Sequence, residues 1–204
     1  MSLGLQRHML FPARPFGRNA ALAGVLAVSL GLAGCGGPPP VTFDLNSSRP
    51  DVVAGRGRGQ LVVNEPIATQ PADSNRIVIR TGPDAVAYLT GAQWADRLPR
   101  LVQSRLIETF ENARAMKAVG RPGLAADNVL HTDIRRFEID VTRSEALVEI
   151  TAKIVNTSGR IVSADVFSAI VPAPSTEPAN ATASLDLALS EVMGKIVLWT
   201  RARV

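Results

Sequence analysis

Three consecutive apolar patterns in the middle of the chain constrain its fold most strongly. Ala146–Ile154 alternates apolar with polar side chains, as a strand does in a sheet with one face exposed to water. Val129–Val141 shifts phase part-way, and a β-bulge near Arg135-Arg136 would reconcile its two halves. Asn156–Arg160 (NTSGR) supplies a hairpin turn, after which Arg160–Val171 returns. The sequence therefore predicts three successive antiparallel strands.

Two other segments have the spacing of amphipathic helices. Gln93–Val119 carries apolar residues three or four positions apart. Pro99 must lie in its first turn, because a proline deep inside a helix removes a hydrogen bond and clashes. After the loop Pro172–Asn180, a second helix is predicted to run to the end of the chain. Its apolar stripe consists of Leu185, Leu189, Val192, Ile196 and Trp199.

Shorter strand patterns precede the first helix in Gln60–Ala68, Arg76–Arg80 and Asp84–Leu89. The predicted order is therefore β-β-(β)-α-β-β-β-α. Runs of strands followed by helices indicate an α+β fold. We expect a single domain with a mainly antiparallel sheet and two amphipathic helices packed on one face. An exposed edge strand, for which Gln60–Ala68 is a candidate, would offer a partner a site for strand addition.

The N-terminal segment and the single cysteine together predict a lipid anchor. Three arginines precede the apolar stretch Ala20–Gly34, which has the pattern of a secretory signal peptide and is too short to span a bilayer. Leu32-Ala33-Gly34-Cys35 resembles the bacterial lipobox. This resemblance implies cleavage between Gly34 and Cys35, a diacylglyceryl group on the Cys35 thiol and an acyl chain on the new amino terminus. Several acyl chains on one residue would hold the protein durably to a bilayer.

The chain then divides into three parts. Residues 1–34 form the signal peptide, residues 35–59 a lipid-anchored flexible tether, and residues 60–204 the folded domain. Thr42–Leu45 interrupts the tether with apolar side chains that are expected to pack locally. Gly55–Gly59 (GRGRG) is interpreted as a solvated linker, because a dinucleotide loop would have to follow a strand and open a helix.

Charge and composition exclude several functional classes. The net charge of the whole chain is +4, and the leader holds three arginines and no acid, so the remainder carries +1. Basic residues are interspersed with acidic ones, which argues against nucleic-acid binding. After cleavage only His131 remains among the histidines, and no free thiol is left, so a Cys/His metal site is excluded. The sequence has neither a Gly-x-Ser-x-Gly elbow nor a Walker A motif. We therefore expect neither an enzyme nor a cofactor.

One long segment carries a family resemblance. VAYLTGAQWADRLPRLVQSRLIETF (Val86–Phe110) resembles the Tyr…Trp-Ala-x-x-Leu-Pro-x-Leu segment of the ABC-type transport auxiliary lipoproteins, which include the paraquat-inducible protein C-like lipoproteins. DIRRFEIDV (Asp133–Val141) and the segment Asn156–Pro172 fit a later strand and hairpin of that family. The matching positions are Phe43, Leu45, Tyr88, Trp94, Ala95, Leu98, Pro99 and Leu101.

The resemblance implies a non-catalytic, periplasm-facing accessory subunit of an MCE-type ABC system, which moves phospholipids between the inner and outer membranes. An ABC ATPase would hydrolyse ATP beside its permease, an MCE-domain protein would form the lipid conduit, and this chain would dock or cap that conduit. A ring-shaped conduit would suit a homo-oligomer. Gly36, rather than aspartate, follows Cys35, which favours the outer membrane as the destination.

Two questions stay open at the level of sequence. Trp94 and Tyr88 are candidates for partner contact, but Trp94 and Trp199 both lie on apolar patterns and fit core packing as well. The rival function is that of an outer-membrane assembly lipoprotein, such as an accessory of lipopolysaccharide transport or of a cell-wall synthase. The Trp-Ala-x-x-Leu-Pro segment is the feature that discriminates between the two.

Overall fold

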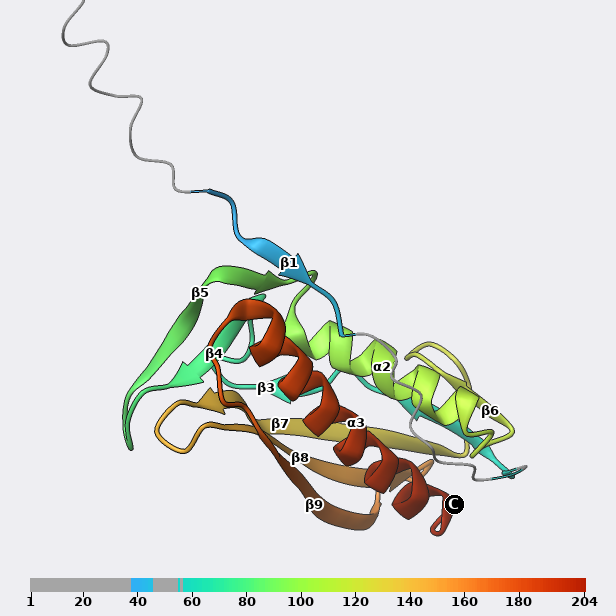
Figure 1. The fold of residues 1–204 in the computed structure, drawn as a ribbon. Coiled ribbons are helices and arrows are strands. Elements are labelled where there is room, and N and C mark those ends of the chain that lie inside the picture. The colour runs from blue at the N-terminus through green and yellow to red at the C-terminus, as the bar shows by residue number, and fades with distance from the viewer. Residues whose placement is uncertain (1–37, 46–54, 56) are drawn as a thin grey trace, which may run out of the picture. The chain divides into compact units, whose positions relative to one another are not determined.

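The sheet is built around one long central strand, β7 (Asn128–Asp140) (Figure 1). On one side β7 pairs antiparallel with β8 (Glu145–Asn156), which pairs antiparallel with β9 (Ile161–Pro172). These three strands confirm the predicted antiparallel run. The register of β7 shifts between Ile134 and Arg136, which confirms the predicted bulge. The computed structural model describes residues 38–45, 55 and 57–204, of which Pro40–Val204 form one compact unit.

Short strands on the other side of β7 make the sheet mixed. Strands β2, β3 and β4 all run parallel to β7. Strand β5 pairs antiparallel with β4, while β1 is parallel to β5 and β6 is parallel to β2. The bounds are β1 (Val41–Phe43), β2 (Gln60–Val63), β3 (Ile67–Ala68), β4 (Arg76–Arg80), β5 (Val86–Trp94) and β6 (Ala118–Gly120).

The predicted edge strand lies inside the sheet. Gln60–Ala68 forms two strands, β2 and β3, separated around Pro66, and β2 is paired on both sides by β6 and β7. The prediction that this segment offers an exposed edge is therefore wrong for β2, whereas β3 pairs only with β7 within the described residues. Strand β9 instead pairs only with β8 within the described part of the chain.

The first helix begins later than its apolar spacing indicated. Helix α2 spans Leu98–Asn112, with Pro99 in its first turn as predicted. Trp94, which the periodicity had placed on the helix, is the last residue of β5. It lies four residues before Leu98, so its position in the sequence imitates a helical repeat although its backbone is extended.

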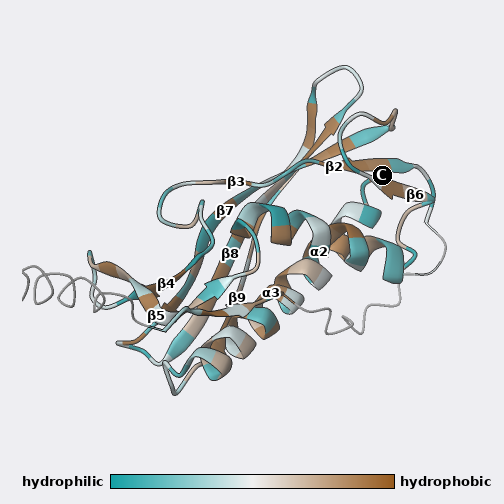
Figure 2. Ribbon diagram, turned by 90° about the horizontal axis from the view of Figure 1, so that it is seen from above, coloured by the Kyte–Doolittle hydropathy of each residue, from teal (hydrophilic) through white to brown (hydrophobic). Residues whose placement is uncertain are grey.

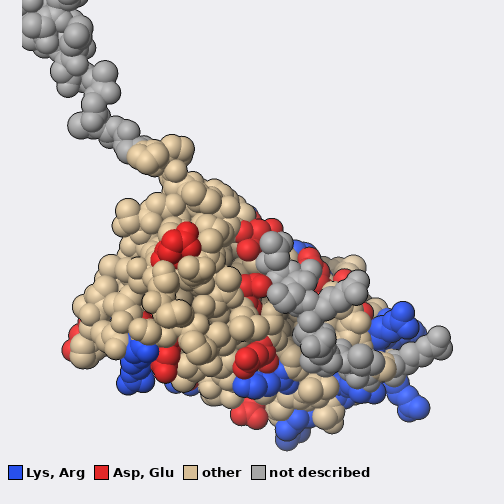
Figure 3. All heavy atoms as spheres, in the orientation of Figure 1, with Lys and Arg blue, Asp and Glu red and all other residues tan. Residues whose placement is uncertain are grey.

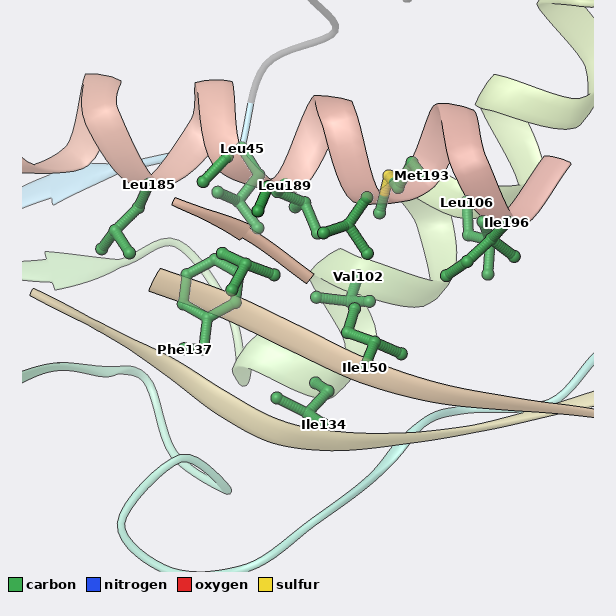
Figure 4. Close-up of a cluster of buried hydrophobic side chains, with 14 of the residues drawn as sticks. Leu45, Val102, Leu106, Ile134, Phe137, Ile150, Leu185, Leu189, Met193 and Ile196 are labelled. Carbon is green, nitrogen blue, oxygen red and sulfur yellow. The ribbon is translucent and has the colours of Figure 1, made fainter. Parts of the chain in front are cut away.

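The core lies between the sheet and the two helices, which lie on one face of it: α3 packs over β8 and β9, and α2 lies beside α3 over β2 and β6 (Figures 1 and 2). Helix α3 (Pro178–Arg201) begins with Glu177, whose carboxylate accepts a hydrogen bond from the Asn180 N–H at 3.1 Å. Its predicted apolar stripe is buried. Figure 4 shows side chains of α3 meeting those of α2 and of the sheet. The labelled members are Leu45, Val102, Leu106, Ile134, Phe137, Ile150, Leu185, Leu189, Met193 and Ile196.

Replacing Trp94 by alanine tests its role in this core. The indole is 1% exposed and packs edge-on against Phe137, with ring centroids 5.9 Å apart and an interplanar angle of 82°. We expect Trp94→Ala to lower the free energy of unfolding by about 3–5 kcal/mol, measured by urea denaturation. The control Leu124→Ala truncates a side chain that is 67% exposed and should change it by less than about 0.5 kcal/mol. Equal effects of the two substitutions would contradict the packing described.

Candidate docking surfaces

The predicted anchor residues Gly34 and Cys35 lie outside the described residues. The chain joins the domain at β1, which is held beside β5. The Ala95 N–H donates to the Phe43 carbonyl oxygen at 2.7 Å, and the Gln93 side-chain amide donates to the Thr42 hydroxyl at 3.1 Å. Leu45 is 5% exposed and belongs to the core. The prediction that Thr42–Leu45 packs locally is confirmed.

The two candidate contact residues on β5 have different environments. Trp94 is buried, so it offers no exposed surface to a partner. Tyr88 is half-buried, and the Arg76 guanidinium carbon lies 3.4 Å from the centre of its ring. This cation–π contact covers one face of the Tyr88 ring. The structure therefore does not bring Trp94 and Tyr88 together into one contact site.

Trp199 on α3 also packs inward. It is 8% exposed and meets Phe167 of β9 edge-on, with ring centroids 5.4 Å apart. The Arg203 guanidinium carbon lies 4.9 Å from the Trp199 ring centre, and Arg203 Nε donates to the Ser163 hydroxyl at 3.0 Å. These contacts of Trp199 and Arg203 hold the end of α3 against β9.

Unpaired cations gather at one end of the domain, which we call the basic end. This end contains the C-termini of α2 and α3, the start of β6 and the β8–β9 turn, and Figure 3 shows lysines and arginines on its visible face. All members are exposed, and within the described chain none is within ion-pair distance of a carboxylate. The basic end consists of Arg58, Arg114, Lys117, Arg160, Arg201 and Arg203.

A glycine brings the GRGRG segment to this end. The Gly57 N–H donates to the Arg114 carbonyl oxygen at 2.9 Å, just beyond the end of α2. A Cβ atom on Gly57 would lie 1.6 Å from the Ala115 carbonyl oxygen, so only glycine allows this close approach. Lys117 N–H then donates to the Gly59 carbonyl oxygen at 3.0 Å. The contacts on either side of Arg58 fix its backbone among the cations of the basic end.

Cations elsewhere in the described chain are largely paired with acids. Arg97 contacts both Glu65 and Asp73, and Lys153 Nζ lies 2.8 Å from the Asp133 carboxylate across β7 and β8. The hydrogen bond that Arg97 donates to Asp73 raises the pKa of Arg97, which remains charged at all relevant pH values. The uneven distribution of partners is what distinguishes the basic end from the rest of the surface.

An arginine–carboxylate cluster lies at the opposite end of β7. Arg80 donates to both oxygens of Glu138, at 2.9 and 3.1 Å, and Arg136 Nε donates to the same carboxylate at 2.8 Å. The hydrogen bond to Glu138 raises the pKa of Arg80. The cluster borders a groove of about 400 Å³ that also includes Asp140 and Arg143. Because Glu138 receives both arginines, this cluster serves to join β4 to β7.

Arg105 is a functional candidate that the sequence did not reveal. Its side chain is 3% exposed between α2 and α3, with its Nη2 atom 3.3 Å from the Ser190 hydroxyl and 3.6 Å from Asp186 Oδ1. Burial lowers the pKa of Arg105, and the nearby acids offset this only in part. Arg105 directly precedes Leu106 and follows Val102 by three residues, so its helical position could have indicated burial.

The described residues offer no grouping of three or more potential metal ligands. None of the described helices has the length and apolarity to cross a membrane. His131 is half-buried, and its Nδ1 atom lies 3.2 Å from the side-chain nitrogen of Asn64.

The architecture defines a single α+β domain, with a mixed sheet covered on one face by two helices. Residues 43–197 match the family described as the ABC-type transport auxiliary lipoprotein component, and the chain belongs to this family. The match begins at β1 and ends in α3, so it includes both core helices.

Three known proteins are similar to this chain in sequence or in structure. The chain is 31% identical to protein XCC0632 of Xanthomonas campestris, assigned to DUF330; the alignment covers 81% of this chain and 94% of that one with a TM-score of 0.67. The crystal structure of another, uncharacterized protein has a TM-score of 0.66 over 79% of this chain and 99% of its own, but at 12% identity it shows the fold alone. The uncharacterized protein bll6063 of Bradyrhizobium diazoefficiens is 32% identical over 185 residues, which is 88% of this chain and half of that protein's length.

Removing the charge of Asp140 should weaken the domain in a pH-dependent way. Asp140 is 7% exposed and accepts hydrogen bonds from the Thr142 hydroxyl at 2.6 Å and from the Thr142 N–H at 3.0 Å. The hydrogen bond from the Thr142 hydroxyl, together with those from the Thr142 and Arg143 N–H groups, lowers the pKa of the Asp140 carboxyl, although burial acts to raise it. The resulting stability is fully present above the ordinary aspartate pKa near 3.9 and is lost as the pH falls through the lowered value.

We therefore expect Asp140→Asn to lower the melting temperature at about pH 7 and the deficit to shrink below about pH 4. Thermal denaturation followed by circular dichroism across this range is the measurement. Asp84→Asn, in the exposed turn before β5, is the control and should show a much smaller deficit. A deficit for Asp140→Asn that stays constant down to about pH 2 would contradict the assignment.

Proposed function

We propose that this protein is the lipid-anchored docking subunit of an MCE-type ABC transport system that moves phospholipids between the inner and outer membranes. It belongs to a family of auxiliary components of ABC-type transport, which supports a role beside a permease and an ATPase. We further propose that it is anchored in the outer membrane through Cys35, faces the periplasm and catalyses no reaction itself.

The tether limits how far the domain can lie from its anchor. Val41 follows Cys35 by only six residues. A fully extended chain spans at most about 3.6 Å per residue, so β1 starts within about 22 Å of the lipidated cysteine. This short connection supports a domain held close to one membrane rather than one that reaches freely across the periplasm.

The observation that carries the docking role is the separation of β1 from the basic end along α2. The start of α2 is joined to the β4–β5 region, where the Leu98 N–H donates to the Ser74 carbonyl oxygen at 2.9 Å. Arg114 follows the other end of the helix, about 22 Å away at 1.5 Å per residue. The cations therefore lie at the far end of α2 from β1 (Figure 1).

A surface with unpaired cations at this distance from the anchor suits an acidic surface on a partner protein. Complementary charge raises association rates and makes binding sensitive to salt. Long cationic side chains on a solvated surface also cost little to hold unpaired. We propose that the basic end meets an acidic rim of the MCE-domain protein.

Purification of the intact lipoprotein from gently solubilised membranes tests this function. We expect an MCE-domain protein, a permease and an ATPase to be recovered and identified by mass spectrometry. The double variant Arg114→Glu/Lys117→Glu should reduce their recovery at least about tenfold at low salt, because it replaces two attractive charges with repulsive ones. Recovery from the unchanged protein should also fall as salt rises.

The matched control Arg100→Glu/Arg143→Glu makes the same change in charge away from the basic end, at side chains that are 56% and 71% exposed. It should leave recovery nearly unchanged. Equal losses for both double variants would remove the basic end as the docking surface. Recovery of a lipopolysaccharide-transport or cell-wall assembly instead, without any MCE-domain protein, would overturn the proposed function in favour of its rival.

A further inference from the structure

Strand β9 is a long sheet edge with an apolar outer surface. Its 12 residues pair with β8 on one side only, within the described part of the chain. The side chains of Val166 and Ile170 are 44% and 56% exposed. Those of Ala169 and Val171, the two neighbours of Ile170 in the strand, are buried in the core. Between its ends β9 contains no lysine, arginine or proline, which often protect an edge strand from pairing, and Asp165 is its one charged residue.

Hydrogen bonds show which backbone groups face outward from this edge. The Val166 N–H donates to its neighbour's carboxylate, Asp165 Oδ1, at 2.9 Å, so it does not point to β8. Backbone groups of alternate residues point the same way in an antiparallel strand. The outward groups therefore belong to Ala164, Val166, Ser168 and Ile170. The Ser168 carbonyl oxygen agrees, because it accepts a hydrogen bond from Lys195 Nζ at 2.7 Å.

The outward residues are arranged almost symmetrically about Val166. The small residues Ala164 and Ser168 lie two residues to either side of Val166, and the strand is regular from Ser163 onward, because the register with β8 shifts between Ile161 and Ser163. An antiparallel strand of the same sequence, centred on Val166, would place Val166 against itself and Ala164 against Ser168. Every facing pair on this surface would then be apolar or small and uncharged.

We propose that β9 pairs antiparallel with β9 of a second copy of this chain, with a two-fold axis at Val166, so that the two sheets become continuous. The symmetry of the residue pattern is the reason for choosing a second copy as the occupant, because a two-fold interface must be complementary to itself. The same register places Asp165 opposite Phe167 of the other copy, so the two Asp165 carboxylates do not face each other.

Forming this pair requires only a small exchange of hydrogen bonds. The Val166 N–H leaves the exposed Asp165 carboxylate and donates to the Val166 carbonyl of the other copy. Lys195 can keep its bond to Ser168, because a carbonyl oxygen has two lone pairs.

A cysteine at the two-fold axis tests this arrangement directly. Facing residues in a hydrogen-bonded antiparallel pair have Cα atoms about 5.5 Å apart, within the range of a disulfide. The purified full-length lipoprotein in detergent, carrying Val166→Cys, should form a disulfide-linked dimer under a mild oxidant. Val86→Cys replaces a valine of equal exposure, 45%, on β5 and should stay monomeric on the same non-reducing gel. The unchanged protein controls for linkage through Cys35.

The register has its own test. Ala164→Cys and Ser168→Cys proteins should each form little disulfide alone, because identical positions would lie about 14 Å apart along the strands. A mixture of the two should give the mixed dimer. The unchanged protein should have the mass of a dimer by light scattering after subtraction of detergent, and Val166→Lys should reduce it to that of a monomer.

Two results would overturn the proposal. One is a monomeric mass at all concentrations with no disulfide in Val166→Cys. The other is a larger assembly without that disulfide, which would mean that copies associate through another surface. Neither result bears on the transport role, because the recovery of transport subunits through the basic end is measured separately.

Discussion

The structure depends on β7 being paired along both of its sides. Its antiparallel partner β8 is almost as long as β7 itself, whereas three short parallel strands share its other side. This arrangement buries Leu130 and Ile139 completely at the two ends of the strand. The other elements take their positions from β7. The helices cover a face of the sheet to which both β7 and β8 contribute. Strand β1 is connected to β7 only through β5 and β4.

The cations at the two ends of β7 differ in whether they have partners within the fold. Near the C-terminal end of β7, arginines are held by Glu138 and by neighbouring backbone, so they are committed to the fold. At its N-terminal end lie the basic end and two helix C-termini, where cations also interact favourably with the helix dipole. Within the described residues the fold uses none of these charges for an ion pair, so they remain accessible to a partner, which is why we propose a docking role for them.

Local patterns predicted the long elements well. The phase change near Arg135, the turn at Asn156–Arg160 and the stripe of α3 all appear in the structure, because each depends on neighbours in the sequence. The parallel pairings did not follow from the sequence. Short strands such as β2 and β4 carry no signal for which distant strand they join, so Gln60–Val63 was wrongly expected to belong to an edge.

The candidate surfaces show the same limit. Trp94 has a helical spacing but lies on a strand, since the turn between β5 and α2 is set by contacts with β1 and Ser74. The basic end unites residues from four separate stretches of the chain, and no single stretch is strongly basic. The buried Arg105 could have been suspected from its helical phase, whereas the meeting of Arg58, Arg114 and Arg201 required the fold.

The chain contains three lysines, and they report on three different surfaces. Lys117 lies at the basic end, Lys153 on the sheet face opposite the helices, and Lys195 beside the free edge of β9. Amine-specific cross-linking of the assembly in its native membrane, read by mass spectrometry, therefore tests the central claim most directly. The account predicts cross-links from Lys117 to an MCE-domain protein. Cross-links to that protein from Lys153 or Lys195, with none from Lys117, would contradict it.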